Sequence, residues 1–474
     1  MNCRRAVPCL CWRPQVKPDH AALGSVRSTV AGITWPPLLA GEAASLAALM
    51  HQLEQTQWLS ADALAMLQHQ QLVKTAAHAE THSAHFRNRM QAAGLRPEQL
   101  STRENLRRLP VMRRRDVQAA GETLFCTQIP RAHAPVAESS TSGSSGEPVV
   151  VKRTAVSQLI WMAMTLREHL WQRRDFRGRL AVIRSDHLQG DQMDLPTWGP
   201  PASLLFETGS SHALAVRIGI DQRIEWLQSI NPDYLLVYPS YLAALLRQFE
   251  QRGLSLPRLR QIRTINETLT PYIREYALRV LGAGIADLYS SQEVGIIAAQ
   301  CPDSGLYHVM AESLIVEVLD EQDVTCAPGQ VGRVVLTDLH NFATPLIRYD
   351  LGDYAEMADA CPCGRGLPAL KRIAGRRRNM VQLPDGRSLW PAVGGLRYSE
   401  IAPIRQFQFI QRDRETIEVR LVSDAPLTAY QEGRIGDLIR VALDFSFKLQ
   451  FTYFPEQIPS GPGGKFEEFV CELA

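Results

Sequence analysis

The sequence predicts an α/β protein in which a large N-terminal domain, with mainly parallel sheets flanked by helices, is followed by a small C-terminal α+β domain. Three observations support this class. The chain has 474 residues, more than one hydrophobic core usually spans. From about residue 136 to residue 350, β-rich runs alternate with helical runs. After about residue 375, this alternation gives way to a hairpin, a helix and a strand.

The first stretch of the chain, to about residue 135, is helical in pattern. Its run "LAALMHQLEQTQWLSADALAMLQHQQLVKTAAHAETHSAHFRNRMQAAG" repeats apolar residues at three- and four-residue spacing and ends at Gly94. Further on, the β-rich runs "RLAVIRS", "SLLFETG", "DYLLVY", "QIRTIN" and "IADLYSS" alternate with the helical runs "SQLIWMAMTLREHLWQ", "SYLAALLRQFEQRG" and "TPYIREYALRVLG". Such alternation predicts βα units that build a mainly parallel sheet with helices on both faces.

The C-terminal segment has a different pattern. In "QFQFIQRDRETIEVRLV", apolar and polar residues alternate on both sides of residues 412–415, as they do in a hairpin. "AYQEGRIGDLIRVALD" then predicts a helix, and "KLQFTYF" predicts a strand. We therefore expect a large domain over residues 41–375 and a small one over residues 376–474, after a poorly defined segment of residues 1–40.

Charge and composition exclude several classes of partner. Lys and Arg total 51 against 49 for Asp and Glu, so the net charge of +2 gives no broad surface for nucleic acid or an anionic membrane. Small molecules are the expected partners. No run reaches the roughly 18 apolar residues that span a bilayer, and "AVPCLCW" is too short and Pro-interrupted for a signal peptide. We expect a cytoplasmic protein whose nine cysteines are thiols or metal ligands rather than disulfides.

The loop "STSGSSGEP", residues 140–148, lies between the β-leaning runs "APVAE" and "VVVKRT". Its glycines let backbone amides turn toward a ligand, and its hydroxyls add donors, so the loop can cradle phosphates. It lacks the lysine and the spacing of a Walker loop. A flexible Ser/Gly linker has the same composition and stays an alternative. The residues concerned are Thr141, Ser142, Gly143, Ser144, Ser145 and Gly146.

This loop resembles the phosphate-binding signature of adenylate-forming enzymes, the superfamily of acyl-CoA synthetases, peptide-synthetase adenylation domains and luciferases. "ADLYSSQEVG" resembles a second motif of that superfamily. The resemblance implies that Tyr289 stacks on adenine, that Ser290 and Ser291 line the ATP site, and that Glu293 binds Mg²⁺. Taken alone, a carboxylate in "SSQE" is more commonly a helix cap.

Three further motifs follow in the order that the superfamily requires. "TPLIRYDLGD" implies that Asp353 holds the ribose hydroxyls, and "AGRRRNMV" implies that Arg376 reaches the ribose or phosphate. "PSGPGGKFEEFV" places Lys465 where the superfamily has its catalytic lysine. Separately, these would be a strand and turn, a solvated basic turn and a surface lysine.

Within the superfamily, the chain resembles the phenylacetate-CoA ligase-like branch, which includes proteins of capsule biosynthesis. "LRRLPVMRRRDV", "YPSYLAALL", "INETLTPYIRE" with Glu267 at the ATP site, and "LPDGRSLWP" carry this resemblance, which extends from about residue 50 to the end. Two features depart from the pattern. Glu147 replaces a common lysine. Arg378 and Asn379 replace the acidic pair of the interdomain hinge, which implies an altered rotation between the two half-reactions.

The resemblance implies that ATP activates a carboxylic acid as an acyl-AMP, with release of pyrophosphate. The acyl group then passes to the thiol of coenzyme A or of a carrier-protein phosphopantetheine, after the small mobile domain has moved Lys465 away. Opposing charge should be the main catalytic contribution, because two anions must meet. An amide-bond synthetase and a non-catalytic carrier-binding module are the alternatives.

The acid is expected to bind between the segment after "DYLLVY" and the "YSSQEVG" loop. Tyrosine and apolar neighbours favour an aromatic or medium-length apolar acid. Ordinary core packing at the end of a strand is the alternative. The candidate wall residues are Tyr238, Pro239, Tyr241 and Gly295.

A structural zinc site is also predicted. Cys301 and His308 stand seven apart in "CPDSGLYH", and Cys361 and Cys363 form a C-x-C in "ACPCGRG". Two such pairs can supply four ligands to a closed tetrahedral site, and the branch includes members with zinc at matching positions. The alternative is a buried apolar cysteine and a loop thiol pair. Three N-terminal cysteines are expected to be free thiols, namely Cys3, Cys9 and Cys11.

Overall fold

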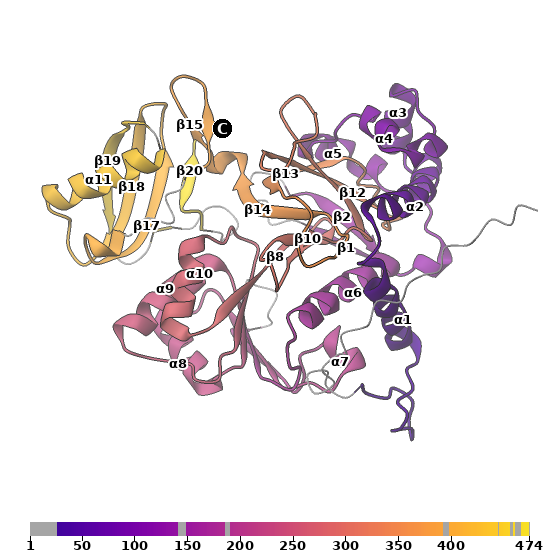
Figure 1. Ribbon diagram of the computed structural model, residues 1–474, viewed down its shortest axis with the longest axis horizontal. Coiled ribbons are helices and arrows are strands. Elements are labelled where there is room, and N and C mark those ends of the chain that lie inside the picture. The colour runs from indigo at the N-terminus through magenta and orange to yellow at the C-terminus, as the bar shows by residue number, and fades with distance from the viewer. Residues whose placement is uncertain are drawn as a thin grey trace, which may run out of the picture.

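The computed structural model describes residues 26–140, 148–184, 190–391, 398–443, 445–455, 458–459 and 466–473. Within them, a twelve-stranded mixed sheet flanked by helices forms the larger part of the molecule, and a four-stranded sheet with a helix forms a smaller C-terminal part. Figure 1 shows the smaller part, in yellow, at one end of the molecule. The α/β class that the sequence predicts is confirmed.

The N-terminal stretch is helical, as predicted. Hydroxyl side chains begin three of its helices. Ser60 accepts from the amide of Ala63, Ser83 from that of Phe86, and Thr102 from that of Asn105. The helices share a core with the end of β12 and the segment before β13. The elements are α1 (Gly41–Thr56), α2 (Ala61–His82), α3 (Ala84–Ala92), α4 (Arg103–Arg108), α5 (Arg114–Ala120) and the 3₁₀ segments Pro97–Ser101, Gly121–Leu124 and Arg131–His133.

The central part of the chain contains two strands of a hairpin and the twelve strands of the large sheet. The hairpin consists of β1 (Val136–Ser140) and β2 (Val150–Thr154). The sheet consists of β3 (Leu180–Arg184), β4 (Gln192–Leu195), β5 (Ser211–Ala215), β6 (Tyr234–Val237), β7 (Gln261–Ile265), β8 (Gly284–Ser291), β9 (Gly295–Gln300), β10 (Tyr307–Val309), β11 (Leu314–Leu319), β12 (Val331–Asp338), β13 (Tyr349–Met357) and β14 (Ala369–Arg376).

The large sheet has a parallel half and an antiparallel half. Its order is β11, β12, β13, β14, β10, β9, β8, β7, β6, β3, β5, β4. The pairs β5–β3, β3–β6, β6–β7 and β7–β8 are parallel, and the other neighbours are antiparallel. Helices join β6, β7 and β8, whereas a short turn joins β8 to β9 and forces them antiparallel. The predicted parallel pairing therefore holds only where helices cross over.

Helices cover the two faces of the sheet with separate cores. On one face lie α8 (Ile220–Ile230), α9 (Pro239–Gln251) and α10 (Pro271–Leu281), which pack against β3, β6 and β7. On the other face, α6 (Ala155–Trp171) and α1 pack against β8, β9 and β12. Figure 1 shows these two groups as separate layers. In the described ranges, no helix has the length and the apolar character that crossing a membrane requires.

One predicted strand is wrong. The run "SLLFETG", residues 203–209, was expected to be extended, but its first residues belong to the helical turn α7 (Ala202–Leu205). A short apolar run cannot by itself distinguish a strand from a buried turn of helix. The preceding Pro201 begins this turn, and the strands of the region, β4 and β5, lie on either side of it.

The smaller C-terminal part follows the predicted order. The β17–β18 hairpin is built around residues 412–415, and the predicted helix and final strand follow it. The sheet order is β19, β18, β17, β20. The elements are β15 (Val381–Gln382), β16 (Ser388–Leu389), β17 (Ile404–Gln411), β18 (Thr416–Ser423), α11 (Ala429–Leu443), β19 (Lys448–Phe454), β20 (Phe469–Cys471) and the 3₁₀ segments η4 (Arg377–Asn379) and η6 (Tyr398–Glu400).

Candidate active site

Three of the residues predicted for nucleotide binding meet near the carboxyl ends of strands β8 and β14. Asp353 in β13 faces Arg376, the last residue of β14, across the antiparallel ladder. Arg376 Nε donates to one oxygen of Asp353 over 3.3 Å, and the Tyr289 hydroxyl in β8 donates to the other over 3.0 Å. Three strands separate β8 from β13 in the sheet. The contact therefore depends on the tertiary fold and not on neighbouring strands.

Burial and charge fix the protonation of this cluster. Burial, reinforced by the Asp353 carboxylate, raises the pKa of Tyr289 well above its usual range, so the phenol stays protonated and donates. Burial opposes the charge of Arg376, but the carboxylates of Asp353 and Glu467 outweigh it and raise the pKa of that guanidinium. One place thus offers an aromatic ring for stacking, an acceptor for sugar hydroxyls and a cation for phosphate.

The carboxylate of Glu293 lies buried in the turn between β8 and β9. Ser290 and Ser291 end β8, and the Ser291 hydroxyl accepts from the amide of Val294 over 3.3 Å, which closes the turn. Arg114 Nη1 lies 3.9 Å from Glu293 Oε1. The charge of Glu293 also contributes to the raised pKa values of the tyrosine and arginine described above. The acidic turn and the β13–β14 cluster therefore lie within electrostatic reach of each other.

A buried arginine positions Arg114 at this turn. Arg348, only 2% exposed, pairs with Glu317 over 3.0 Å, and its Nη1 donates to two carbonyls at the end of α4, over 2.7 Å each. The amide of Met112 donates to the Arg348 carbonyl over 2.7 Å and continues the sheet beyond β13. These contacts hold the start of α5, and with it Arg114, against the turn of Glu293.

Tyr349, the first residue of β13, brings a second buried polar group to the turn. Its side chain is fully buried, and among the described residues its hydroxyl has no hydrogen-bond partner. Burial, and then the charge of Glu293, raises the pKa of Tyr349. A buried hydroxyl without a protein partner, beside a buried carboxylate, is where a water or ligand is expected to bind.

The Ser/Gly loop and the C-terminal lysine lie outside the described residues, but the hairpin that carries the loop is described. Lys152 in β2 donates from its amide to Thr344 Oγ1 over 2.9 Å, and that hydroxyl donates back to the Lys152 carbonyl over 2.9 Å. Arg153 Nη2 donates to the carbonyl of Gln292, next to Glu293, over 2.5 Å. The hairpin is thereby attached to the site. The predicted residues that lie outside the described ranges are Thr141, Ser142, Gly143, Ser144, Ser145, Gly146, Lys465 and the thiols Cys3, Cys9 and Cys11.

Glu267, predicted to line the ATP site, caps the start of α9. Its carboxylate accepts from the amide of Ser240 over 2.9 Å and from the Ser240 hydroxyl over 3.1 Å. The partial positive charge at a helix N-terminus stabilises a carboxylate in this position. The observed contacts therefore give Glu267 a structural role at the start of α9.

The predicted walls of the acid pocket fall into two groups. Tyr238, Pro239 and Tyr241 lie at the start of α9, with the two tyrosine rings 6.0 Å apart. Arg223 stacks on Tyr241 at 4.7 Å, and Tyr241 packs against the core of α8 to α10. Gly295 lies against Trp161 of α6, which packs on the other face of the sheet.

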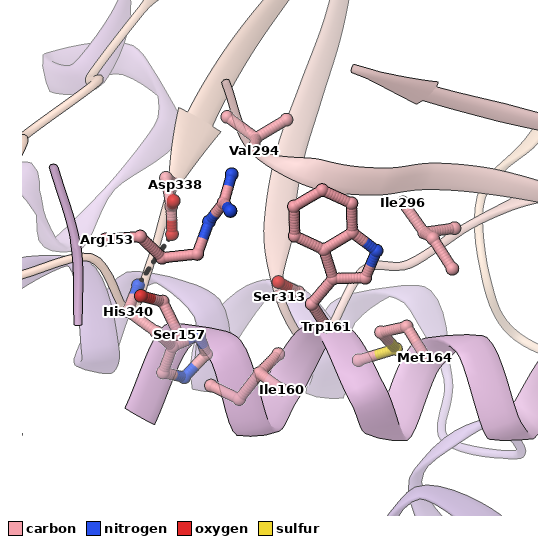
Figure 2. Close-up of a pocket in the computed structure, with 10 residues that line it drawn as sticks. All are labelled: Arg153, Ser157, Ile160, Trp161, Met164, Val294, Ile296, Ser313, Asp338 and His340. Atoms are coloured by element: carbon pink, nitrogen blue, oxygen red, sulfur yellow. Dashed lines mark hydrogen bonds between the residues drawn. The ribbon is translucent and has the colours of Figure 1, made fainter. Parts of the chain in front are cut away.

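Gly295 is required by its surroundings. Its φ is +84°, and a Cβ at this position would lie 3.0 Å from the ring of Trp161. The guanidinium of Arg153 stacks on the same indole at 4.2 Å. Figure 2 shows Trp161 rising from α6 toward the strand of Ile296, with Arg153 beside it. The indole is therefore held on both sides next to the turn of Glu293.

A small polar cavity of about 10 Å³, room for one water, adjoins Trp161. Burial raises the pKa of Asp338 to about 6 and lowers that of His340 to about 4. The Asp338 carboxylate accepts from the His340 amide over 2.9 Å, as Figure 2 shows. The lining residues are Arg153, Ser157, Ile160, Trp161, Met164, Val294, Ile296, Ser313, Asp338 and His340.

The four predicted metal ligands lie together. Cys301 follows β9, His308 lies in β10, and Cys361 and Cys363 lie between β13 and β14; their ligand atoms are all within 4.8 Å of one another. Two sulfurs, of Cys301 and Cys361, are 3.9 Å apart, close to the roughly 3.8 Å that tetrahedral zinc thiolates require. Burial lowers the pKa of His308 to about 4, which keeps the imidazole neutral as a ligand must be.

Several residues at the site escape prediction from sequence. Arg114 lies in a motif that carries the family resemblance, but its contact with Glu293 spans the fold. Arg153 and Trp161 lie beside the functional motifs and Tyr349 lies within "TPLIRYDLGD", with no local pattern that marks their role. The available signal was the adjacency of Tyr349 to the "TPLIRYDLGD" aspartate, since β13 places both at the same edge.

Comparison with known proteins supports the family. No protein-family model matches the chain. The phenylacetate-coenzyme A ligase of Thermus thermophilus is 24% identical over 395 residues, which is 78% of this chain and 83% of that protein. The Escherichia coli phenylacetate-coenzyme A ligase is also 24% identical, over 81% of this chain and 88% of that protein. Protein CapK of Staphylococcus aureus is 25% identical over 42% of this chain and 43% of its own length.

A solved structure shares the fold. The 2-hydroxyisobutyryl-CoA ligase in its postadenylation state, in complex with 2-HIB-AMP, matches with a TM-score of 0.68 and 20% identity, over 85% of this chain and 89% of that one. Similarity in sequence and in fold thus confirms the predicted resemblance to the adenylate-forming enzyme superfamily, and within it to the phenylacetate-CoA ligase-like branch.

Proposed function

We propose that the chain is an ATP- and Mg²⁺-dependent acid–thiol ligase, which converts a carboxylic acid into an acyl-AMP with release of pyrophosphate and then transfers the acyl group to a thiol. One observation carries the proposal. Tyr289, Asp353 and Arg376, from distant parts of the sequence, share hydrogen bonds within electrostatic reach of the buried Glu293. The similarity to phenylacetate-coenzyme A ligases supports the same reaction class.

In the first half-reaction, the protein must bring two anions together. Tyr289 stacks on adenine, Asp353 accepts from the ribose hydroxyls, and Arg376 offsets phosphate charge. Glu293, beside the free hydroxyl of Tyr349, would hold Mg²⁺, which reduces the charge on the phosphates when it is bound. The loop of residues 141–146 would hold the leaving pyrophosphate, and Lys465 would bridge the acid and the α-phosphate.

The proposal also covers the identity of the thiol acceptor and the class of acid. Coenzyme A is the first acceptor to test, since the relatives are named as coenzyme A ligases, and the phosphopantetheine arm of a carrier protein offers the same thiol. For the acid we retain an aromatic or medium-length apolar class. Aromatic rings line both candidate walls, Tyr238 with Tyr241 on one and Trp161 against Gly295 on the other.

We further propose a division into a large unit, residues 41–375, that binds ATP and acid, and a small mobile unit, residues 376–474, that carries Lys465. The strands support this division, because the twelve-stranded sheet ends at Arg376 and the small sheet begins after it. Such a division lets the catalytic lysine leave between half-reactions. ATP and coenzyme A are cytoplasmic reagents, and the proposal places the enzyme in that compartment.

We also infer a structural Zn²⁺ at Cys301, His308, Cys361 and Cys363. The donor set consists of three thiols and a neutral imidazole, three of the four side chains are buried, and their spacing suits a tetrahedron. A closed set of four protein ligands leaves no position for substrate. Its role would be to hold the loop after β9 against the segment between β13 and β14.

Replacement of Lys465 by Ala tests the proposed chemistry. We expect acid-dependent ATP–pyrophosphate exchange to fall at least about a hundredfold, because the bridging charge is needed only to form the adenylate. Thioester formation from supplied acyl-AMP should stay within about twofold of the wild type. Lys448→Ala, which removes an exposed lysine at the start of β19, is the matched control and should change neither rate.

Equal loss in the two assays would overturn the role of Lys465. Exchange that proceeds while only amines accept the acyl group would identify an amide-bond synthetase. Absence of exchange with aryl, fatty and amino acids alike would leave a non-catalytic carrier-binding module, and the proposed function would be wrong.

A further inference from the structure

The segment η4 connects the large sheet to the small one. In Figure 1, β14 leads from the large sheet toward the yellow C-terminal part, and η4 follows it directly. Arg378 and Asn379 belong to this connection. A partly buried cation such as Arg378 needs a complementary group, because it is costly to bury without a partner.

The complement is Glu467, two residues beyond Lys465 in the sequence. Arg378 donates to one oxygen of Glu467 from Nε over 3.1 Å and from Nη2 over 2.9 Å. Each of these two side chains is 24% exposed, so the pair is partly shielded from solvent and salt. A charge-assisted contact of this geometry is among the stronger interactions that side chains make.

Asn379 connects the two parts through one amide group. Its Oδ1 accepts from the backbone amide of Arg376 over 2.9 Å, and its Nδ2 donates to the carbonyl of Phe469 over 2.8 Å. Phe469 begins β20, which pairs with β17 of the small sheet. The Asn379 side chain therefore hydrogen-bonds to the end of β14 in the large sheet and to the edge strand β20 of the small sheet at the same time.

The path of contacts continues into the nucleotide site. Arg376 donates to Asp353, and Asp353 accepts from Tyr289. Rotation of the small part must change the backbone between Arg376 and Asn379, and such a change would separate groups that this path now holds. The contacts therefore favour one arrangement of the two parts, the one in which the residues after Lys465 lie beside the nucleotide cluster.

We propose that Arg378, Asn379 and Glu467 form a clasp that holds the C-terminal part in the arrangement required for adenylation. The three are positioning residues, because they act through the placement of the C-terminal segment and not on the reacting atoms. The inference rests on the proposed function for its chemical consequence. It also makes a conformational claim that can be measured without any activity.

The experiment compares Arg378→Ala, Glu467→Ala and the exchanged pair Arg378→Glu with Glu467→Arg. The acid is whichever one supports the fastest exchange in the wild type. Each single variant should lower ATP–pyrophosphate exchange at least about tenfold, because it removes a charge-assisted pair and leaves its partner half-buried. Thioester formation from supplied acyl-AMP should stay within about twofold or rise. The exchanged pair should recover most of the exchange activity.

The matched control is Arg440→Ala. Arg440 pairs with Asp437 over 2.8 Å on the exposed surface of α11, in the same part of the molecule but away from η4. We expect both reactions to be unchanged in this variant. Equal loss of the two reactions in the clasp variants, or failure of the exchanged pair to recover activity, would overturn the proposal.

A second readout measures the arrangement itself. Dyes attached through unnatural amino acids at Met66 in α2 and Val441 in α11, which are 56% and 84% exposed, report the distance between the two parts by energy transfer. The single clasp variants should shift or broaden this distance, and the exchanged pair should restore it. An unchanged distance in every variant contradicts the clasp. Lack of exchange in the wild type with all acids contradicts the proposed function instead, and the dye distance still decides the clasp.

Discussion

The carboxylate of Asp353 already accepts two hydrogen bonds, from Tyr289 over 3.0 Å and from Arg376 over 3.3 Å. Both oxygens are thereby oriented before a nucleotide arrives, and a carboxylate has further lone pairs for the two ribose hydroxyls. Preorganisation of this kind lowers the cost of binding, because the side chain does not need to be ordered by the ligand.

The side chains of Asp353 and Tyr289 should contribute unequally to the binding of ATP. Asp353→Ala removes the proposed acceptor for the sugar hydroxyls, so we expect KM for ATP to rise at least about tenfold. Tyr289→Phe keeps the ring that would stack on adenine and removes only the hydroxyl, so KM should rise by about threefold or less. Steady-state exchange at varied ATP concentration measures both. A larger effect of Tyr289→Phe than of Asp353→Ala would contradict the assignment.

The close packing of Gly295 against Trp161 predicts that a larger residue at position 295 destabilises the protein. Gly295→Ala places a Cβ 3.0 Å from the Trp161 ring in a residue whose φ is +84°, so strain and a clash combine. We expect the free energy of unfolding to fall by about 2–4 kcal/mol. Gly282→Ala is the control, because Gly282 has φ +66° and open space around it, and it should cost only about 1 kcal/mol. Urea unfolding measures the two free energies of unfolding. Equal losses would show that the Trp161 ring moves aside without a cost, which contradicts the predicted clash.

At the scale of elements, the cysteine and histidine cluster joins two loops that otherwise share few buried apolar groups. The small core around Cys301, Cys361 and Ala369 is the least extensive of the hydrophobic clusters that the described residues form. A metal ion would supply cross-links that this core does not. The loops carry no proposed catalytic group, so the ion should matter for stability and not for the chemical step.

The zinc proposal predicts a metal content of about one ion per chain in protein purified without chelator. The double variant Cys361→Ser with Cys363→Ser should lose the ion and unfold roughly 5–10 °C lower. Cys326→Ser alters a buried thiol remote from the cluster and should retain the ion. Metal analysis by mass spectrometry and thermal unfolding measure the two quantities. Equal zinc in the double variant and the wild type would rule out this ligand set.

The sequence predicts the elements best where the pattern is long. The runs "QFQFIQRDRETIEVRLV" and "KLQFTYF" correspond to β17–β18 and β19, because alternation over many residues specifies one face. The run "SLLFETG" became a turn of helix, since its apolar residues are too few to define a period. The antiparallel half of the large sheet was not predicted either, because the direction of pairing depends on the connections between strands and not on the strands themselves.

At the scale of the whole molecule, a second pair of charged side chains besides the clasp comes within electrostatic reach where the two parts adjoin. Glu468 follows Glu467 and faces Arg247 of α9, with Glu267 nearby. Burial is the main cause that raises the pKa of Glu468 to about 7; Arg247 opposes the rise and Glu267 adds to it. The ionised form is therefore disfavoured where the two parts touch.

This shift gives the contact a pH dependence. A carboxyl group whose pKa rises from about 4.5 to about 7 on docking does not destabilise the docked arrangement below pH 4.5. The loss of docking free energy grows between pH 4.5 and pH 7 and is constant above pH 7. The docked arrangement should therefore weaken as pH rises from 5 to 7. Glu468→Gln cannot ionise, so the difference in Tm between this variant and the wild type should grow over that range and then level off. A difference that is constant from pH 5 to 8 would contradict the shift.

The candidate site could be predicted from sequence as far as its motifs are local. Tyr289, Asp353 and Arg376 lie in short segments whose residue order carries the family resemblance, and the structure brings them together. Arg114 and Tyr349 were missed, because their proximity to Glu293 arises only when α5, β13 and the β8–β9 turn pack together. No short-range pattern encodes such a meeting.

The products formed from ATP test the central claim most directly. The protein is incubated with ATP, Mg²⁺ and a panel of aryl, fatty and amino acids, without any thiol, and phosphorus NMR follows the nucleotide. Activation of an acid at this site predicts pyrophosphate and an acyl-AMP or AMP, with at least one acid and only when that acid is present. Formation of ADP and inorganic phosphate, or no turnover of ATP with any acid, would contradict it.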